Sequence, residues 1–296
     1  MFLFAEGEKQ LPLIVQFVNH YLGEPVHAIQ MATTHKWWTI LFAKFGTTPE
    51  AMFGEYTVEN AIPWYTIMFV IACLLSVIVI SILKGKLSED DPNHGQLTLE
   101  AGFLAIKDLV VNIIGEGGFR YFPVVATFSV LILVSNLMGM VPLFWAPTAS
   151  VNVTYALGIA SFVYFNYVGI KENGLLKYIA HFAGPKLPWY MFLITGLIFV
   201  IEIISMSIRP FTLGVRLFAN MFADEQLYGQ ISGLYPPFTH FLVQLVLLLL
   251  GLFVALVQTF VFTLLSMIYI NLALPHDDHA SSEHTEDNHE AALAHA

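Results

Sequence analysis

The sequence predicts an all-α polytopic membrane protein. Hydrophobic residues make up 57% of its 296 residues, charged residues make up only 11%, and the mean hydropathy is +0.70. A soluble domain carries about 25% charged residues, so this composition is typical of a chain that lies in hydrocarbon. Several apolar segments also reach the length of about 20 residues that a helix needs to cross a bilayer. We expect five crossings and one amphipathic helix on the membrane surface.

Composition divides the chain into three parts. Residues 1–61 are mixed and mildly apolar, and we expect an extramembrane or interfacial region there. Residues 62–274 form the predicted membrane domain. Residues 275–296 are rich in histidine and acid and are predicted to be disordered, because such a composition cannot bury enough apolar surface. The histidines of this tail could bind a divalent metal, but no ligand spacing repeats among them, so we expect no metal site.

Three segments, 62–83, 121–145 and 151–170, each predict a single crossing. Between the first two, apolar residues recur with 4-3-4-3 spacing, at Leu99, Phe103, Ile106, Val110 and Ile113. This spacing predicts an amphipathic helix over 97–116 that lies on the membrane surface. A soluble helix packed against other chains would show the same pattern.

Two much longer apolar segments follow, at 189–231 and 238–274. As straight helices they would be about 65 Å and about 55 Å long, because an α-helix rises 1.5 Å per residue. The hydrocarbon core of a bilayer is only about 30 Å thick. We therefore expect a steep tilt, or a kink near Arg209 and Pro210. The two helices would form a paired hairpin that could wrap along the outside of another helical object.

The first long segment carries ionisable residues at membrane depth. Glu202, Arg209 and Arg216 recur seven residues apart, so they share one face of a helix. An arginine at this depth costs roughly 2.5–3.5 kcal/mol on insertion scales, which makes it a functional candidate. Small or polar residues lie beside the charges on that face: Ser205, Thr212, Ala219 and Asn220. Such residues allow a second helix to approach closely within a bilayer.

Arg216 needs a counter-charge if it is buried. Helical rise places Glu202 about 21 Å and Glu225 about 14 Å from it along the axis, and Glu225 is turned to the far side of the helix. The other apolar segments contain no Asp or Glu. We therefore predict that the partner carboxylate belongs to another chain. The alternative is an arginine that snorkels to a helix end or is bathed by a water cavity.

Basic residues predict the orientation of the chain. They gather in the connections on one side of the membrane, at Lys84, Lys86, Lys107, Arg120, Lys171, Lys177 and Lys186. The short connections on the other side, 146–150 and 232–237, carry none. By the positive-inside rule the basic side is cytoplasmic, which places the N-terminus outside and the C-terminus in the cytoplasm.

The stretch from Arg209 to Met221 reads Arg-Pro-Phe-Thr-Leu-Gly-Val-Arg-Leu-Phe-Ala-Asn-Met. It resembles the core motif of subunit a of the rotary F-type ATP synthase, which reads basic-Pro-x-Ser-Leu-x-x-Arg-Leu-Phe-x-Asn-Met. The resemblance extends to four further places: Gln258, Tyr269, the stretch 135–138 and the stretch 147–154. Together these matches cover most of residues 60–274, and the arginine motif is highly specific.

The resemblance implies that Arg216 is the essential stator charge of the family. It assigns Glu225 to a half-channel open to the outside and Glu202 to one on the cytoplasmic side. The remaining predicted residues of the proton path are Asn220, Gln258, Arg209, Thr212 and Tyr269. Two positions depart from the family pattern: Gly251 stands where many members carry His or Glu, and Gly139 replaces an acid found in some bacterial members.

The predicted function is therefore a stator ion-channel subunit in a bacterial inner membrane. The resemblance implies a ring of c subunits and b-type peripheral stalk subunits as partners, with the F1 sector reached indirectly. We expect no cofactor and no nucleic acid, because neither a GxxxxGK[ST] loop nor a basic patch is present. The alternative is an ion-coupled secondary transporter, which would show repeated halves with paired broken segments. A third possibility, an intramembrane hydrolase, would need an HExxH or GxSxG motif, and the sequence contains neither.

Overall fold

The fold was obtained as a computed structural model, which describes residues 11–43, 61–85, 88, 92–141, 144–174, 178, 192–232 and 237–274. Every regular element in these ranges is a helix, which confirms the all-α prediction. The elements are α1 (Leu13–Ala32), α2 (Thr34–Ala43), α4 (Trp64–Lys84), α5 (His94–Ile114), η2 (Glu116–Tyr121), α6 (Phe122–Met138), η3 (Pro147–Ala149), α7 (Val151–Asn173), α9 (Phe192–Ser232) and α10 (Pro237–Ala273).

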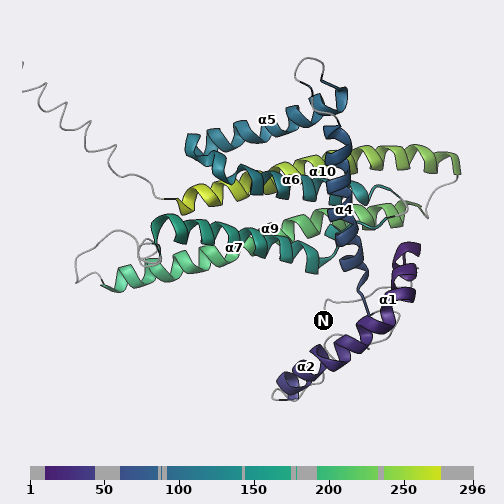
Figure 1. The fold of residues 1–296 in the computed structure, drawn as a ribbon, viewed down its shortest axis with the longest axis horizontal. Coiled ribbons are helices and arrows are strands. Elements are labelled where there is room, and N and C mark those ends of the chain that lie inside the picture. Colours follow the sequence, from purple (N-terminus) through teal and green to yellow (C-terminus); the bar gives the residue numbers. More distant parts are fainter. Residues whose placement is uncertain are drawn as a thin grey trace, which may run out of the picture.

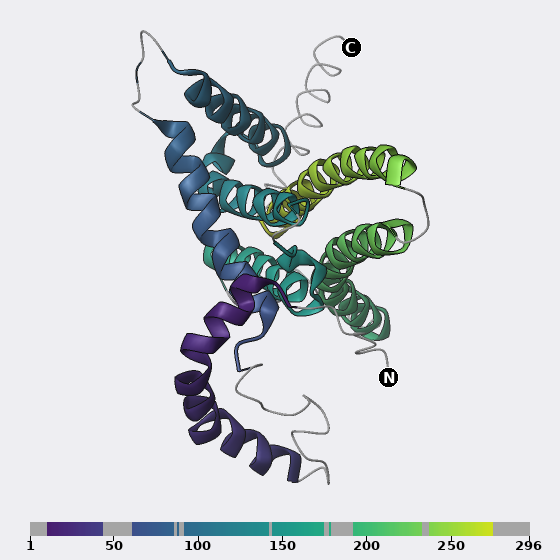
Figure 2. The same ribbon diagram turned by 90° about the vertical axis from the view of Figure 1, so that its right-hand side faces the viewer.

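Among the described residues, five helices are long and apolar enough to cross a membrane, in agreement with the sequence. The first four of these helical stretches are Trp64–Lys84, Glu116–Met138, Val151–Asn173 and Gly196–Asp224, and the fifth is Leu245–Ala273. They are not parallel to one another. Figures 1 and 2 show α6, α7, α9 and α10 running side by side, while α4 stands steeply across them.

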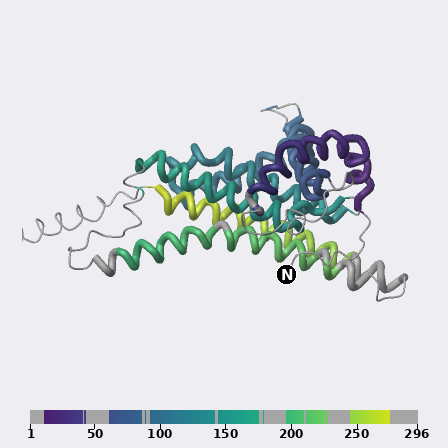
Figure 3. The backbone as a smooth tube through the Cα atoms, turned by 90° about the horizontal axis from the view of Figure 1, so that it is seen from below, coloured from purple at the N-terminus to yellow at the C-terminus, as the bar shows by residue number. Residues whose placement is uncertain are grey.

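The two C-terminal helices are as long as the sequence predicts. α9 has 41 residues and α10 has 37, so they are roughly 61 Å and 55 Å long. α9 stays helical through Arg209 and Pro210, where a kink was one of two possibilities. Figure 3 shows α9 passing unbroken beneath the other helices. A helix this long fits the hydrocarbon thickness only when it is strongly tilted.

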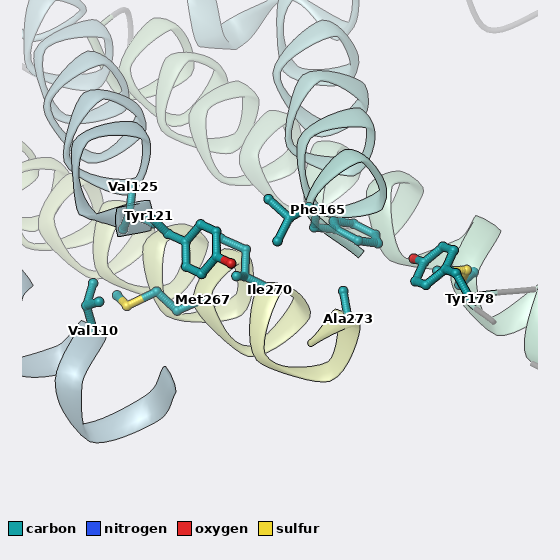
Figure 4. Close-up of a cluster of buried hydrophobic side chains, with 10 residues drawn as sticks. Val110, Tyr121, Val125, Phe165, Tyr178, Met267, Ile270 and Ala273 are labelled. Atoms are coloured by element: carbon teal, nitrogen blue, oxygen red, sulfur yellow. The ribbon is translucent and has the colours of Figure 1, made fainter. Parts of the chain in front are cut away.

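α10 lies at the centre of the packing. A buried cluster joins it to α5, η2, α6, α7 and α9, and Figure 4 shows most of its side chains. Its fully or nearly fully buried members are Val110, Tyr121, Val125, Phe165, Val168, Tyr178, Met206, Met267, Ile270 and Ala273. A second cluster packs α9 on α6, α7 and α10 through Leu213, Leu217, Ile132 and Phe262. Along one side, the hairpin of α9 and α10 therefore packs against other helices of the same chain.

Two boundaries differ from the sequence prediction. The amphipathic helix begins at His94, three residues before the predicted start, and it packs on α4, α6 and α10. The second crossing was expected to continue to Trp145, but α6 ends at Met138. Gly139 follows the last residue of α6, and a side chain there would clash, because an added Cβ would lie 2.6 Å from Cβ of Ala146.

The described part of the N-terminal region, residues 11–43, forms two helices that the sequence did not resolve. α1 is tied to the start of α4 by Asn19, which exchanges two hydrogen bonds of 3.1 Å with the backbone of Ile62. Gln30 also donates to the carbonyl oxygen of Ala61 at 2.8 Å. The predicted tail, 275–296, lies outside the described residues.

Candidate functional site

One face of α9 packs closely on α7. A Cβ added to Gly214 would lie 3.2 Å from the carbonyl oxygen of Thr154 and 3.3 Å from Cα of Tyr155. The neighbouring side chains of Leu213 and Leu217 are buried on the same side. A side chain here would push the two backbones apart by a few tenths of an ångström. The packing fixes the rotation of α9 and turns its opposite face away from the chain.

Arg216 lies on that outward face. Its side chain is exposed, and it makes no hydrogen bond or ion pair with any other residue that the structure describes. Thr212 and Ala219, one turn to either side, are exposed as well. The small-residue face predicted from the sequence is therefore open to an approaching helix.

Arg209 is held quite differently from Arg216. Its Nη2 lies 3.6 Å from Oε1 of Glu202, and its side chain is 19% exposed. The guanidinium also lies over the ring of Tyr269 on α10, 5.3 Å from the ring centroid. Arg209 and Tyr269 border a pocket of about 440 Å³ that Ser205 and Thr212 also line, and Glu202 contacts Arg209 without lining it. The structure thus brings together four of the predicted path residues at one end of the site.

A second polar contact lies on the other side of Arg216. Nδ2 of Asn220 donates to Oε1 of Gln258 on α10, at 2.7 Å. Gln258 is only 2% exposed, and its Nε2 has no hydrogen-bond partner among the described residues. A buried amide with an unused donor is costly in an apolar environment. The sequence named both residues, and the fold joins them.

The two outlying motifs of the family resemblance meet at the end of α6. Oγ1 of Thr148, in η3, donates to Oδ1 of Asn136 at 2.8 Å, and both side chains are fully buried. Nδ2 of Asn136 and Oγ of the adjacent Ser135 have no partner within the described ranges. A second group of buried polar atoms therefore lies between α6 and η3.

Sequence reasoning missed Asp224. This carboxylate is half-buried in α9, and its Oδ2 lies 4.0 Å from the point that a Cβ on Gly251 would occupy. The signal was available, because an acid at membrane depth is a functional candidate by default. The sequence analysis named the neighbouring Glu225 instead. Glu225 lies in α9, but its side chain is outside the described part of the structure.

Two further side-chain contacts lie at the end of the molecule that the lysines predict to be cytoplasmic. The Tyr178 hydroxyl donates to Oδ1 of Asn166 at 3.0 Å. Burial raises the pKa of the Tyr178 phenol, although the positive charge of Arg209 acts to lower it. Arg120 forms an exposed ion pair of 2.9 Å with Glu172.

Within the described ranges, no three His, Cys, Asp or Glu side chains gather as a metal site would require.

Fold and site define an integral multi-pass membrane protein whose long helical hairpin carries ionisable and amide side chains at membrane depth. The family model described as ATP synthase A chain matches residues 65–271. The chain is 42% identical over 205 residues to ATP synthase subunit a of Geotalea daltonii, covering 69% of this chain and 84% of that protein. It is 37% identical over 217 residues to ATP synthase subunit a of Aquifex aeolicus, covering 71% and 98%.

The relative from Solibacter usitatus, also an ATP synthase subunit a, is 36% identical over 220 residues, which cover 74% of this chain and 91% of that protein. This chain belongs to the ATP synthase A chain family. It is accordingly a component of the membrane sector of the rotary ATP synthase.

Proposed function

We propose that this chain is the stator subunit that forms two offset half-channels, through which protons reach and leave a carboxylate on the rotor ring. Arg216 is the electrostatic barrier between them. One observation carries the proposal: Arg216 is exposed and has no partner within the described chain, and polar sites lie on both sides of it along α9.

The polar sites are offset along the helix. The pair of Glu202 and Arg209 lies roughly 10–21 Å from Arg216 in one direction, because each residue adds 1.5 Å of rise. Asn220 and Asp224 lie roughly 6–12 Å away in the other direction. A proton that enters through one site therefore cannot step directly to the other. It must be carried by something that moves past Arg216.

The cytoplasmic half-channel would use the pocket beside Arg209, Thr212 and Tyr269, with Glu202 at its mouth. The outer half-channel would use the amides of Asn220 and Gln258, with Asp224 and Glu225 as the titrating groups. Asn136 and Thr148 form a separate buried polar pair between α6 and η3. Unused amide donors suit a path of this kind, because they can hydrogen-bond to moving water.

Arg216 suits the barrier because a guanidinium stays protonated and cannot relay a proton itself. It would attract an ionised carboxylate on the ring of c subunits and block a leak between the half-channels. Each charge that crosses gains about 2.3 kcal/mol per 100 mV, and this energy would drive rotation.

The b-type stalk would hold the subunit still. The subunit would lie in a bacterial inner membrane, with the N-terminus outside and the C-terminus in the cytoplasm. The F1 sector is coupled only indirectly.

The test is to reconstitute the complete ATP synthase with Arg216→Lys or Arg216→Ala in vesicles, and to measure ATP-driven acidification and passive proton leak separately. Both variants should lose coupled pumping, and Arg216→Ala should also leak. Arg120→Lys is the matched control, because Arg120 lies far along the chain in an exposed ion pair. Normal coupled pumping by Arg216→Ala would refute the proposal.

A further inference from the structure

Tyr178, in the connection between α7 and α9, is fixed to α7 at two points. A Cβ added to Gly169 would lie only 2.8 Å from Cζ of the tyrosine, so the ring occupies the space that a side chain there would need. The hydroxyl donates to Oδ1 of Asn166 at 3.0 Å. Nδ2 of Asn166 donates in turn to the carbonyl oxygen of Phe162 at 2.8 Å, which orients the amide so that Oδ1 faces the tyrosine. Because Tyr178 is also buried, its side chain has one well-defined position.

This position connects Tyr178 to the surroundings of Arg209. Tyr178 and Met206 belong to the same buried cluster (Figure 4), and Met206 precedes Arg209 by three residues on one face of α9. Phe165 of that cluster packs its ring 5.6 Å from the ring of Tyr269, and the guanidinium of Arg209 lies over that ring. Burial raises the pKa of the Tyr178 phenol, and the positive charge of Arg209 acts to lower it, as a neighbouring cation should. Two routes of contact, one through α9 and one through α7 and α10, therefore join Tyr178 to Arg209.

Arg209 depends on such packing because its ion pair holds it loosely. Its distance of 3.6 Å from Glu202 is longer than a hydrogen bond, and the side chain of Glu202 is 40% exposed. An ion pair of this kind does little to fix a long side chain in one geometry. The aromatic contacts around the guanidinium must therefore decide where it stays.

We propose that Tyr178 is a positioning residue, which holds Arg209 over Tyr269 and within reach of Glu202. The inference rests on the proposed function, because Arg209 borders the pocket assigned to the cytoplasmic half-channel. Tyr178 is not among the residues that line this pocket, so it acts through Arg209 and carries no proton itself. When the ring is displaced, Arg209 can turn away from Glu202, and the pocket loses the charge that this carboxylate faces.

The experiment measures ATP-driven acidification per assembled complex, with the complete ATP synthase reconstituted in vesicles. Gly169→Ala displaces the ring and leaves Tyr178 and α9 unchanged in sequence, because the three atoms nearest to the added Cβ all belong to Tyr178. Gly117→Ala is the matched control, since Gly117 is exposed and no atom lies within 4 Å of its added Cβ. Gly169→Ala and Tyr178→Ala should lower pumping several-fold. Tyr178→Phe, which keeps the ring and loses only the bond to Asn166, should retain most of it, and Gly117→Ala should have no effect.

A double-mutant cycle with Arg209→Gln separates positioning from a merely structural role. If Tyr178 acts through Arg209, Tyr178→Ala should cause no further loss of pumping once Arg209 is replaced. Gly169→Ala supplies the same cycle if Tyr178→Ala does not assemble. Independent losses that multiply in the double variant would overturn the proposal.

The single variants distinguish this inference from the function on which it rests. Reduced pumping by Arg209→Gln together with normal pumping by Gly169→Ala would overturn the role of Tyr178 alone. Normal pumping by Arg209→Gln would overturn the assignment of Arg209 to the half-channel, and the role of Tyr178 with it.

Discussion

The close approach of the α7 backbone to Gly214 makes the sharpest structural prediction. Replacing Gly214 with alanine places a Cβ only 3.2 Å from the carbonyl oxygen of Thr154, and both sides of this contact are backbone. Neither helix can relieve the contact by rotating a side chain, so α9 must shift away from α7. Because Arg216 lies two residues further along α9, the shift also displaces the charge that we propose faces the rotor.

The structure sets the order of magnitude. Overpacking a well-packed contact costs about 1–3 kcal/mol, with Gly214→Ala near the lower limit and Gly214→Leu at or above the upper one. This cost falls on the packing of α9 and not directly on a reaction barrier, so we expect a small loss of coupled pumping with alanine and a much larger loss with leucine. Gly196→Ala on the same helix should have no effect, because nothing lies within 4 Å of its Cβ.

The assay is ATP-driven acidification in vesicles that contain the reconstituted complex, with the amount of assembled complex measured in the same preparation. Thermal stability of the complex should fall in the order wild type, Gly214→Ala and Gly214→Leu. Equal pumping per assembled complex by wild type and Gly214→Leu would refute the reasoning. It would show that α9 does not depend on this contact for its position.

Two further predictions address the path and the orientation. Asp224→Asn should slow proton-driven ATP synthesis, because it removes a titrating group from the outer path, and Glu225→Gln should do the same. Wild-type rates in both variants would exclude an acidic outer path. In a Cys73→Ala background, cysteines at the exposed Val141 and at Lys171 should be labelled by an impermeant reagent from opposite sides of the membrane. Labelling of both from one side would contradict the proposed orientation.

Local periodicity was enough to predict the membrane-spanning helices, the amphipathic helix and the charged face. Helical spacing depends only on backbone geometry, so residues seven apart along α9 had to lie on one side of it. The contact partners could not be obtained in this way. Gly214 lies against Thr154 because α9 packs on α7, which is distant in the sequence. Asp224 lies near Gly251 because α10 packs on α9. No spacing within α9 encodes either contact.

The contrast between the two arginines shows where sequence pattern and tertiary packing meet. Arg209 has an acid seven residues before it, and the fold closes that pair at 3.6 Å. Arg216 has Arg209 itself at the corresponding position, so the same spacing offers it a like charge. The next acid, Asp224, lies about 12 Å further along and is directed toward α10. The seven-residue repeat thus gives Arg209 a carboxylate within the chain. It leaves Arg216 without one among the described residues. Arg216 also lies on the face whose small side chains allow a second helix to approach. This arrangement favours a carboxylate supplied by the rotor.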